Sequence, residues 1–276
     1  MSNNAAAPSA PQSGRRGPRK PPRPVEVARV ENLSPHMVRI TVTGEALADW
    51  PEGDPTGHCK VFLPAEGETE PALPEMGPDG LMYPKDRPRP VVRTYTPRRI
   101  DRDAKELVLD FVLHGHGEAS TWAQSAKPGM KLAVGGVGRG YVIDTDATKF
   151  HLAGDEAAIP ALAVLLESLP TSAQITVDIE VRGEDAHIVM PEHPNARLQW
   201  HTLAATEQPG STLINALADV APDDQLRIWV ATEAKAVRKI RRALLDRGMP
   251  VENLVTRGYW KLGESNHPDG DYATDA

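Results

Sequence analysis

The chain has 276 residues, of which 40% are hydrophobic and 25% are charged, with a formal net charge of −7 and one cysteine. This length suffices for two compact domains. The negative charge argues against nucleic acid as the main partner, because a phosphate backbone requires a basic surface. The single cysteine, Cys59, excludes an internal disulfide framework and a cysteine-held metal cluster, so we expect a cytoplasmic protein. No apolar run is long enough to span a membrane, and a membrane is not expected as a partner.

Residues 1–24 are rich in proline, alanine and serine, carry five basic residues and contain no acidic residue. They lack the apolar middle of a secretory signal. Because so little apolar surface cannot offset the entropy of ordering, we predict a disordered basic tail. Contact of this tail with an anionic partner is the alternative.

Residues 25–146 are predicted to form an antiparallel β-barrel domain. Apolar and polar residues alternate over 37–43, 59–63 and 107–114, as expected for half-buried strands. Short strands separated by turn-rich joints are typical of an antiparallel barrel or sandwich. Seven prolines between Pro64 and Pro90 predict a long excursion without regular structure, which is either a lid or an insertion.

Residues 147–276 are predicted to form an α/β domain that begins after a joint near Asp146. Predicted strands cover 150–153, 175–181, 226–231 and the segment from Val255 onward. Predicted helices follow Gly154 and cover 234–247, where Gly248 is a favoured stop. Alternation of strands and helices predicts a parallel sheet covered by helices on both faces.

Two motifs in the first half carry groups that suit a flavin. In the segment 93–96, an arginine can bind a pyrophosphate, a tyrosine ring can lie against an isoalloxazine, and threonine hydroxyls can bond a ring nitrogen. The strand 110–114 ends in glycines, and hydroxyls of Ser120 and Thr121 follow beside the amides of a predicted helix start. Each motif alone is equally compatible with a surface strand or a capped corner.

Five motifs in one order give a more specific signal: 93–96, 110–115, Ala119-Ser120 with Trp122, 152–156 and 258–261. This set resembles the siderophore-interacting protein family of FAD-dependent ferric-siderophore reductases. The resemblance implies a ferredoxin-reductase-like fold, with a flavin-binding barrel followed by a domain that binds NADH or NADPH. It also implies that FAD takes a hydride from NAD(P)H and passes single electrons to a ferric siderophore, releasing iron(II). No acid–base catalytic residue and no resident metal are expected, and a monomer is expected.

The resemblance also implies which residues contact the cofactors. Arg93 is placed at the FAD phosphates, Tyr95 and Thr96 at the ring, and Tyr259 with Trp260 as a cap from the second domain. The implied cofactor-binding residues are Arg93, Thr94, Tyr95, Thr96, Asp110, Phe111, Val112, Leu113, His114, Ala119, Ser120, Thr121, Asp155, Glu233, Tyr259 and Trp260. Helix capping by Asp155 and burial of the two terminal aromatics in a strand are the structural alternatives.

Two further features bear on the substrate. Lys60, Arg139 and Lys261 resemble a basic triad that binds anionic ferric siderophores, and unrelated surface charges are the alternative. Thr232 stands where the family commonly has glycine, which leaves the local backbone geometry open. Rival functions are a general flavin reductase or ferredoxin-reductase-type electron transferase, and a non-catalytic protein that binds flavin or siderophore. The sequence leaves the choice between NADH and NADPH open.

Overall fold

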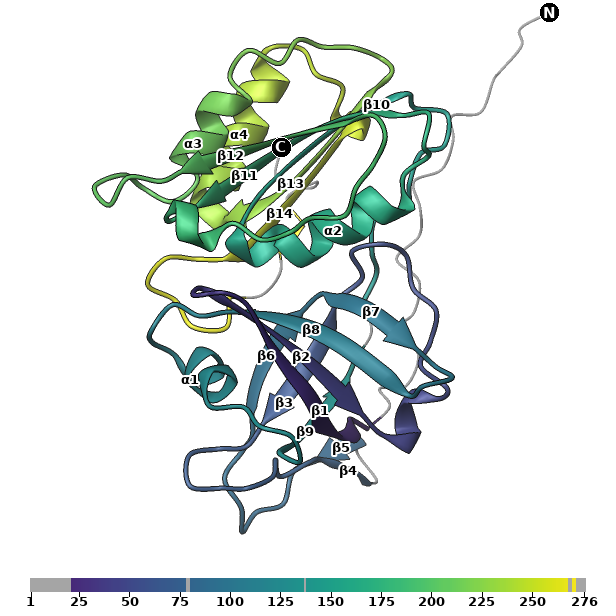
Figure 1. The fold of residues 1–276 in the computed structure, drawn as a ribbon, viewed down its shortest axis with the longest axis vertical. Coiled ribbons are helices and arrows are strands. Elements are labelled where there is room, and N and C mark those ends of the chain that lie inside the picture. Colours follow the sequence, from purple (N-terminus) through teal and green to yellow (C-terminus); the bar gives the residue numbers. More distant parts are fainter. Residues whose placement is uncertain (1–20, 78–79, 137, 268–269, 272–276) are drawn as a thin grey trace, which may run out of the picture.

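The computed structural model describes residues 21–77, 80–136, 138–267 and 270–271. It contains a curled antiparallel sheet from the first half of the chain and a parallel sheet from the second half (Figure 1). The strands of the first sheet are β1 (Arg23–Ser34), β2 (Met37–Thr43), β3 (Cys59–Leu63), β6 (Val91–Tyr95), β7 (Pro97–Asp101), β8 (Glu106–Val112) and β9 (Lys131–Gly135). The helical segments of this half are η1 (Glu45–Leu47) and α1 (Glu118–Gln124).

The first sheet curls because its two edges belong to consecutive strands. The strand order is β6-β3-β9-β1-β2-β8-β7, and only Thr96 separates the edge strands β6 and β7 in the sequence. The edges therefore meet at Thr96, which is buried, and the sheet forms a half-barrel around Ile40, Val61, Leu107 and other apolar residues. The predicted alternation places these residues inside.

The first strand begins earlier than the predicted end of the tail. β1 starts at Arg23, whose backbone pairs with Val134 and whose side chain bonds Ala46 and Asp49 and lies over the ring of Trp50. These contacts compensate for the conformational entropy that the chain loses when it becomes ordered at this point. Residues 1–20 of the predicted tail lie outside the described residues.

The proline-rich excursion contains a regular element that the sequence did not predict. Strands β4 (Glu75–Gly77) and β5 (Gly80–Met82) pair antiparallel, and Arg87 bonds Glu68 at 2.7 Å beside them. The expectation of no regular structure was wrong because a short hairpin needs only three residues in each strand between the prolines. Figure 1 places this hairpin at the end of the barrel away from the second domain.

The second sheet is parallel except at one edge, with the order β12-β11-β10-β13-β14-β15. Its strands are β10 (Lys149–Asp155), β11 (Gln174–Val181), β12 (Ala196–Thr202), β13 (Leu226–Glu233), β14 (Leu254–Trp260) and β15 (Gly270–Asp271). Its helical segments are η2 (Glu156–Ala158), α2 (Ile159–Ser168), η3 (Glu184–Ala186), α3 (Ser211–Ala216), α4 (Ala234–Asp246) and η4 (Val251–Asn253). The predicted strands and helices are all present, whereas β12 and α3 carry weaker patterns and were not predicted.

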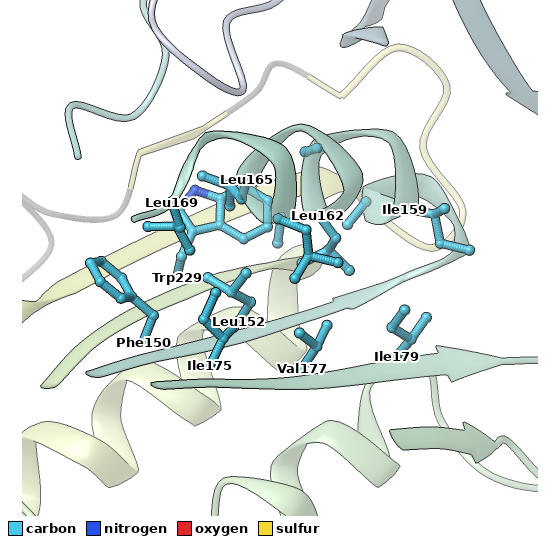
Figure 2. Close-up of a cluster of buried hydrophobic side chains, with 14 of the residues drawn as sticks. Phe150, Leu152, Ile159, Leu162, Leu165, Leu169, Ile175, Val177, Ile179 and Trp229 are labelled. Atoms are coloured by element: carbon cyan, nitrogen blue, oxygen red, sulfur yellow. The ribbon is translucent and has the colours of Figure 1, made fainter. Parts of the chain in front are cut away.

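Helices cover both faces of the parallel sheet. Figure 2 shows the side chains of Leu152, Ile175 and Val177 directed from the strands toward Leu162 and Leu165 of α2. On the other face, α3 and α4 cover a second apolar cluster. In Figure 1, α2 lies between the parallel sheet and the half-barrel, and an ion pair at 2.7 Å links its Glu167 to Arg98 of β7. The two-domain fold class is the predicted one, and in the part of the chain that the structure describes no helix is long and apolar enough to cross a membrane.

The face of the sheet toward α3 holds a buried carboxylate between two imidazoles. The Oδ2 and Oδ1 atoms of Asp178 lie 2.6 Å from Nε2 of His151 and 2.6 Å from Nε2 of His201, respectively. Burial raises the pKa of Asp178, but the hydrogen bonds from the two histidines outweigh it, so the pKa of this carboxyl lies below its usual value. The three side chains come from three neighbouring strands, so the cluster ties β10, β11 and β12 together.

Asp178→Asn is expected to lower the free energy of unfolding at neutral pH by about 1–3 kcal/mol, because two charge-assisted hydrogen bonds are lost. The folded pKa lies below the unfolded value of about 3.9, so the ionised carboxylate stabilises the protein above that pH. This stabilisation disappears as the pH falls through the folded pKa. Urea unfolding over a pH series measures it, with the exposed Asp246→Asn as control. A difference between wild type and Asp178→Asn that persists at strongly acidic pH contradicts this account.

Candidate functional site

The first part of the candidate site is a corner where β6 meets α1. Arg93 lies on β6, and its Nη2 donates to Oε2 of Glu118, the first residue of α1, at 2.7 Å. Two sequence motifs 25 residues apart are therefore neighbours. The Arg93 side chain is 23% exposed, whereas that of Glu118 is 65% exposed and can swing away from the guanidinium. Arg93 is thus held at the surface in a position from which it can bind an anionic ligand instead of Glu118.

An aromatic row lies behind this corner. The rings of Tyr95 and Phe111 have centroids 4.3 Å apart, and Phe111 lies 5.9 Å from Trp122 of α1. Burial raises the pKa of Tyr95, and Arg93 only partly opposes this rise, so the phenol is neutral near pH 7. Phe111 is fully buried, so it is not accessible to a ligand, and it supports the ring of Tyr95 from behind.

The remaining residues of the predicted flavin cradle have different surroundings. The Asp110 carboxylate is bonded by Arg39 at 2.7 and 2.8 Å on the face turned toward the second domain, so it is not open to a cofactor at the Arg93 corner. Val112 packs against the core of the second domain, and Leu113 packs against the barrel core. Asp110 and Phe111 point to opposite faces of one strand, so the consecutive residues of the run from Asp110 to His114 do not all line one cradle.

The turn from β8 into α1 holds the predicted hydroxyls. The backbone N–H of His114 donates to Oγ of Ser120 at 3.1 Å, which leaves the Ser120 hydroxyl proton available to a further acceptor. Ala119 is buried under the corner, and Thr121 is exposed. Burial, the neighbouring His116 and Arg182 lower the pKa of His114, so its imidazole is neutral at pH 7.

The donor set at this corner fits a flavin dinucleotide. It combines a surface guanidinium and a neutral phenol backed by aromatic rings, with Thr94 on the same strand and Thr96 directly after it. The Trp122 indole N–H is buried and has no hydrogen-bond partner among the described residues. A buried donor without an acceptor raises the free energy of the folded protein, so this corner favours a ligand that supplies an additional acceptor.

The second part of the site lies at the carboxyl edge of the parallel sheet. The chain leaves β10 toward β11 on one side, whereas β13 pairs with β10 on the other, so the switch point lies between β10 and β13. Asp155 is the last residue of β10 and Thr232 the penultimate residue of β13, and the Thr232 hydroxyl donates to Oδ2 of Asp155 at 2.7 Å. The Trp260 indole N–H donates to the same oxygen at 2.6 Å. Ligands of open α/β sheets bind at such a crevice.

The structural alternatives foreseen for this edge are also present. Asp155 accepts the backbone N–H of Ala157 at 3.0 Å and so caps η2. Glu233 accepts from the N–H groups of Lys235 and Ala236 at 2.6 and 3.1 Å and caps α4. The ring of Tyr259 packs edge-on against Trp229 at 6.2 Å and is partly buried. Each of these residues therefore has a structural role whether or not it contacts a cofactor.

The three predicted substrate-binding cations occupy distinct positions. Lys60 of β3 donates to Oγ1 of Thr94, directly beside the flavin-docking strand. Arg139 is exposed and lies between two glycines, and a Cβ on Gly140 would lie 2.1 Å from the carbonyl oxygen of Pro55, so only glycine fits this close approach. Lys261 forms an ion pair with Glu264 in the segment after β14. Lys60 is thus joined to the flavin-docking strand by a hydrogen bond, whereas Arg139 and Lys261 lie on separate segments of the chain.

Arg182, which was not among the predicted residues, bridges the two halves. Its Nη2 lies 2.6 Å from Oε2 of the buried Glu156, and its Nη1 donates to the Leu113 carbonyl at 3.5 Å. Arg182 directly follows β11, so its place at the carboxyl edge was the signal that could have revealed it. Through this contact the edge of the parallel sheet lies against the turn that leads into α1.

A half-barrel with a flavin-type corner, followed by a parallel sheet with a ligand edge, defines the ferredoxin-reductase class of two-domain flavoproteins. The ferredoxin reductase of carbazole 1,9a-dioxygenase, 15% identical over 84% of this chain and 68% of its own, shares this fold with a TM-score of 0.60. Residues 26–140 match the siderophore-interacting FAD-binding domain, and residues 147–263 match the siderophore-interacting protein domain. The chain belongs to the siderophore-interacting protein family, as its motif order predicted.

Similar proteins agree with this membership over nearly the full length of the chain. The ferric vibriobactin reductase ViuB of Vibrio cholerae is 30% identical over 250 residues, which cover 88% of this chain and 91% of ViuB. The NADPH-dependent ferric-chelate reductase of Escherichia coli is 30% identical and covers 86% of this chain and 92% of its own. The structure of a siderophore utilization protein from T. fusca has a TM-score of 0.80 at 32% identity, covering 91% and 96% of the two chains.

Proposed function

We propose that this protein is an NAD(P)H-dependent, FAD-containing reductase of ferric siderophores. The observation that carries the proposal is the corner at the barrel seam, where Arg93, Tyr95 and the start of α1 converge in a domain that matches a FAD-binding family. FAD bound there would supply the redox chemistry, in which a hydride from NAD(P)H provides two electrons that reduce two ferric ions one at a time. Iron(II) is held less tightly by hard oxygen donors, so it leaves the siderophore.

The residues of this chain supply binding and orientation for that chemistry. Arg93 would hold the pyrophosphate in place of Glu118, and the hydroxyls of Ser120 and Thr121 would supply further hydrogen bonds to it. Tyr95, supported by Phe111, would provide the aromatic surface for the isoalloxazine. Asp110 also belongs to the predicted set. Because its carboxylate is bonded by Arg39, we propose that it has a structural role and does not contact the cofactor directly.

The second domain is proposed to bind the nicotinamide nucleotide at the carboxyl edge around Asp155, Glu233, Tyr259 and Trp260. In this proposal residues 25–146 bind FAD and residues 147–276 bind the nicotinamide nucleotide. A relative is named for its dependence on NADPH, which favours NADPH as the donor. We place the reaction in the cytoplasm, where reduced nicotinamide nucleotides are available, with a ferric siderophore as partner and a monomeric enzyme.

The proposal is tested by the spectrum of the purified protein after FAD supplementation. NADPH or NADH added without oxygen should bleach the flavin band, and a ferric siderophore with an iron(II) chelator should restore it while the chelate colour develops. A flavin that never bleaches indicates a binding protein. A flavin that bleaches without iron(II) production indicates a general flavin reductase or an electron transferase with another acceptor.

Lys60→Gln and Lys261→Gln are each expected to raise the KM for an anionic ferric siderophore by about two- to fivefold, because a partly exposed cation contributes modestly. The effect should diminish at high salt, since ions screen exposed charges. FAD content should remain that of the wild type. Lys239→Gln, on the exposed face of α4, is the matched control. Equal KM values in both variants, the control and the wild type would remove these lysines from the substrate site.

A further inference from the structure

Three segments of the second domain converge on one carboxylate. Asp155 ends β10 and is 7% exposed, and its Oδ2 accepts from both Thr232 at the end of β13 and Trp260 at the end of β14. Its Oδ1 accepts from the N–H of Ala157, which begins the path into α2. A single side chain thus sets the relative positions of three strand ends at the switch point of the sheet.

The indole N–H of Trp260 is held by this contact. Its indole is partly buried at the end of β14, where the register with β13 shifts between Thr232 and Glu233. The next segment of chain is tied to the same edge, because the N–H of Leu262 donates to Oε1 of Glu233 at 3.2 Å. An indole N–H can only donate, so the contact requires an acceptor oxygen on Asp155.

The charged groups around Asp155 come from every neighbouring element. β11 contributes Glu180, which is already bonded by the N–H of Gly210 and by Thr212 of α3. β13 contributes Glu233, which caps α4, and η2 contributes Glu156, which is paired with Arg182.

Burial raises the pKa of Asp155 to about 6, the bonds from Trp260 and Thr232 oppose that rise, and the charge of Glu180 adds to it. Lys261 follows Trp260 but is paired with Glu264. The two donors to Oδ2 are both neutral, so the hold on Trp260 depends on whether Asp155 itself is ionised.

We infer that Asp155 is a positioning residue for the nicotinamide-nucleotide site: its ionised carboxylate, held by Thr232, orients Trp260 for the reduction of the flavin by NAD(P)H. The inference rests on the proposed function and adds a residue, Thr232, that the sequence marked only as a departure from the family's glycine. Protonation of Asp155 removes the negative charge that strengthens the hydrogen bond from Trp260, so the carboxyl group holds the indole less firmly. Flavin reduction should therefore slow as the pH falls through the pKa of Asp155.

The test follows Trp260 and the reaction in parallel. In nitrogen–proton spectra, the indole resonance that disappears in Trp260→Phe is assigned to Trp260 and followed between about pH 5 and about pH 8.5, a range that brackets the titration. The rate of flavin bleaching by NADPH is measured over the same range. In the wild type both titrations should have a midpoint near pH 6.

Thr232→Val removes one donor to the carboxylate and should move both midpoints upward by about one pH unit, which makes flavin reduction at pH 6 about fivefold slower than in the wild type. Thr232→Ser keeps the hydroxyl and should restore both midpoints. Thr256→Val is the matched control, because the buried Thr256 hydroxyl lies on the adjacent strand and has no hydrogen-bond partner among the described residues. Asp155→Asn should abolish both titrations.

The outcomes separate the two proposals. If the wild type is reduced by NADPH but Thr232→Val has the midpoints of the control, Asp155 does not act through this network and the inference fails while the proposed function stands. If the Trp260 resonance titrates but the rate does not follow it, the contact is structural only and the inference fails again. If the wild type is not reduced at any pH, the proposed function fails and the inference falls with it.

Discussion

Phe111→Ala is expected to lower the free energy of unfolding by about 3–5 kcal/mol, because it removes a fully buried aromatic side chain and leaves a cavity in the barrel core. A second effect is expected in the molecules that remain folded. The ring of Tyr95, 4.3 Å from Phe111, loses the surface that holds it, so FAD should dissociate more readily. Urea unfolding measures the first effect, and fluorescence titration with FAD under folding conditions measures the second.

Phe150→Ala is the control for this prediction. Phe150 is 2% exposed in the core of the second domain, remote in the fold from the aromatic row, so its removal should destabilise the protein by a similar amount. FAD affinity in the folded protein should then stay at the wild-type value. Equal loss of FAD affinity in both variants would show that general destabilisation, and not support of Tyr95, determines flavin binding.

Arg93→Ala is expected to weaken FAD binding by about 10- to 100-fold, because charge-assisted hydrogen bonds to a phosphate contribute about 1.5–3 kcal/mol. The stability of the protein without FAD should change little. The ion-pair partner of Arg93 is the exposed Glu118, and such a surface ion pair contributes at most about 1 kcal/mol. Equilibrium titration with FAD, at low and at high salt, measures the effect.

Two variants sharpen this prediction. Arg99→Ala removes the same charge from an exposed position on β7 and should bind FAD as the wild type does. Arg93→Lys should recover only part of the affinity, because an ammonium group lacks the planar fork of a guanidinium. Glu118→Gln should not weaken FAD binding, since the pyrophosphate and this carboxylate compete for Arg93. Wild-type affinity in Arg93→Ala would place the phosphates elsewhere.

The strands and helices that the sequence predicted are those whose pattern has one strong period. Alternation over 37–43 and 107–112 requires one face to be buried, and α4 carries an apolar stripe that ends at the left-handed Gly248. β12 and α3 were not predicted because they lie at the edge of the sheet, where fewer positions are buried and the pattern is weak. The β4–β5 hairpin was not predicted because none of its residues is buried.

The candidate site was predictable in its parts and not in its connections. The residue types of 93–96 and their order with the later motifs identified the family and the flavin domain without any coordinates. The ion pair between Arg39 and Asp110 could not be predicted from the sequence. The two residues lie on different strands, whose register is set by pairing across the sheet. The position of Arg182 at the carboxyl edge of the sheet was recognisable in the sequence, but its contact with the Leu113 carbonyl of the other half was not.

The amino-acid sequence by itself determined the two-domain class, the family and the flavin chemistry, because these depend on local periodicity and on residue types in order along the chain. Only the tertiary structure decided which of those residues are neighbours. It brought Arg93 to α1 and joined Asp155, Thr232 and Trp260 at one oxygen, since the ends of parallel strands far apart in the chain meet at one edge of the sheet. Contacts of that kind follow from packing, which local pattern does not encode.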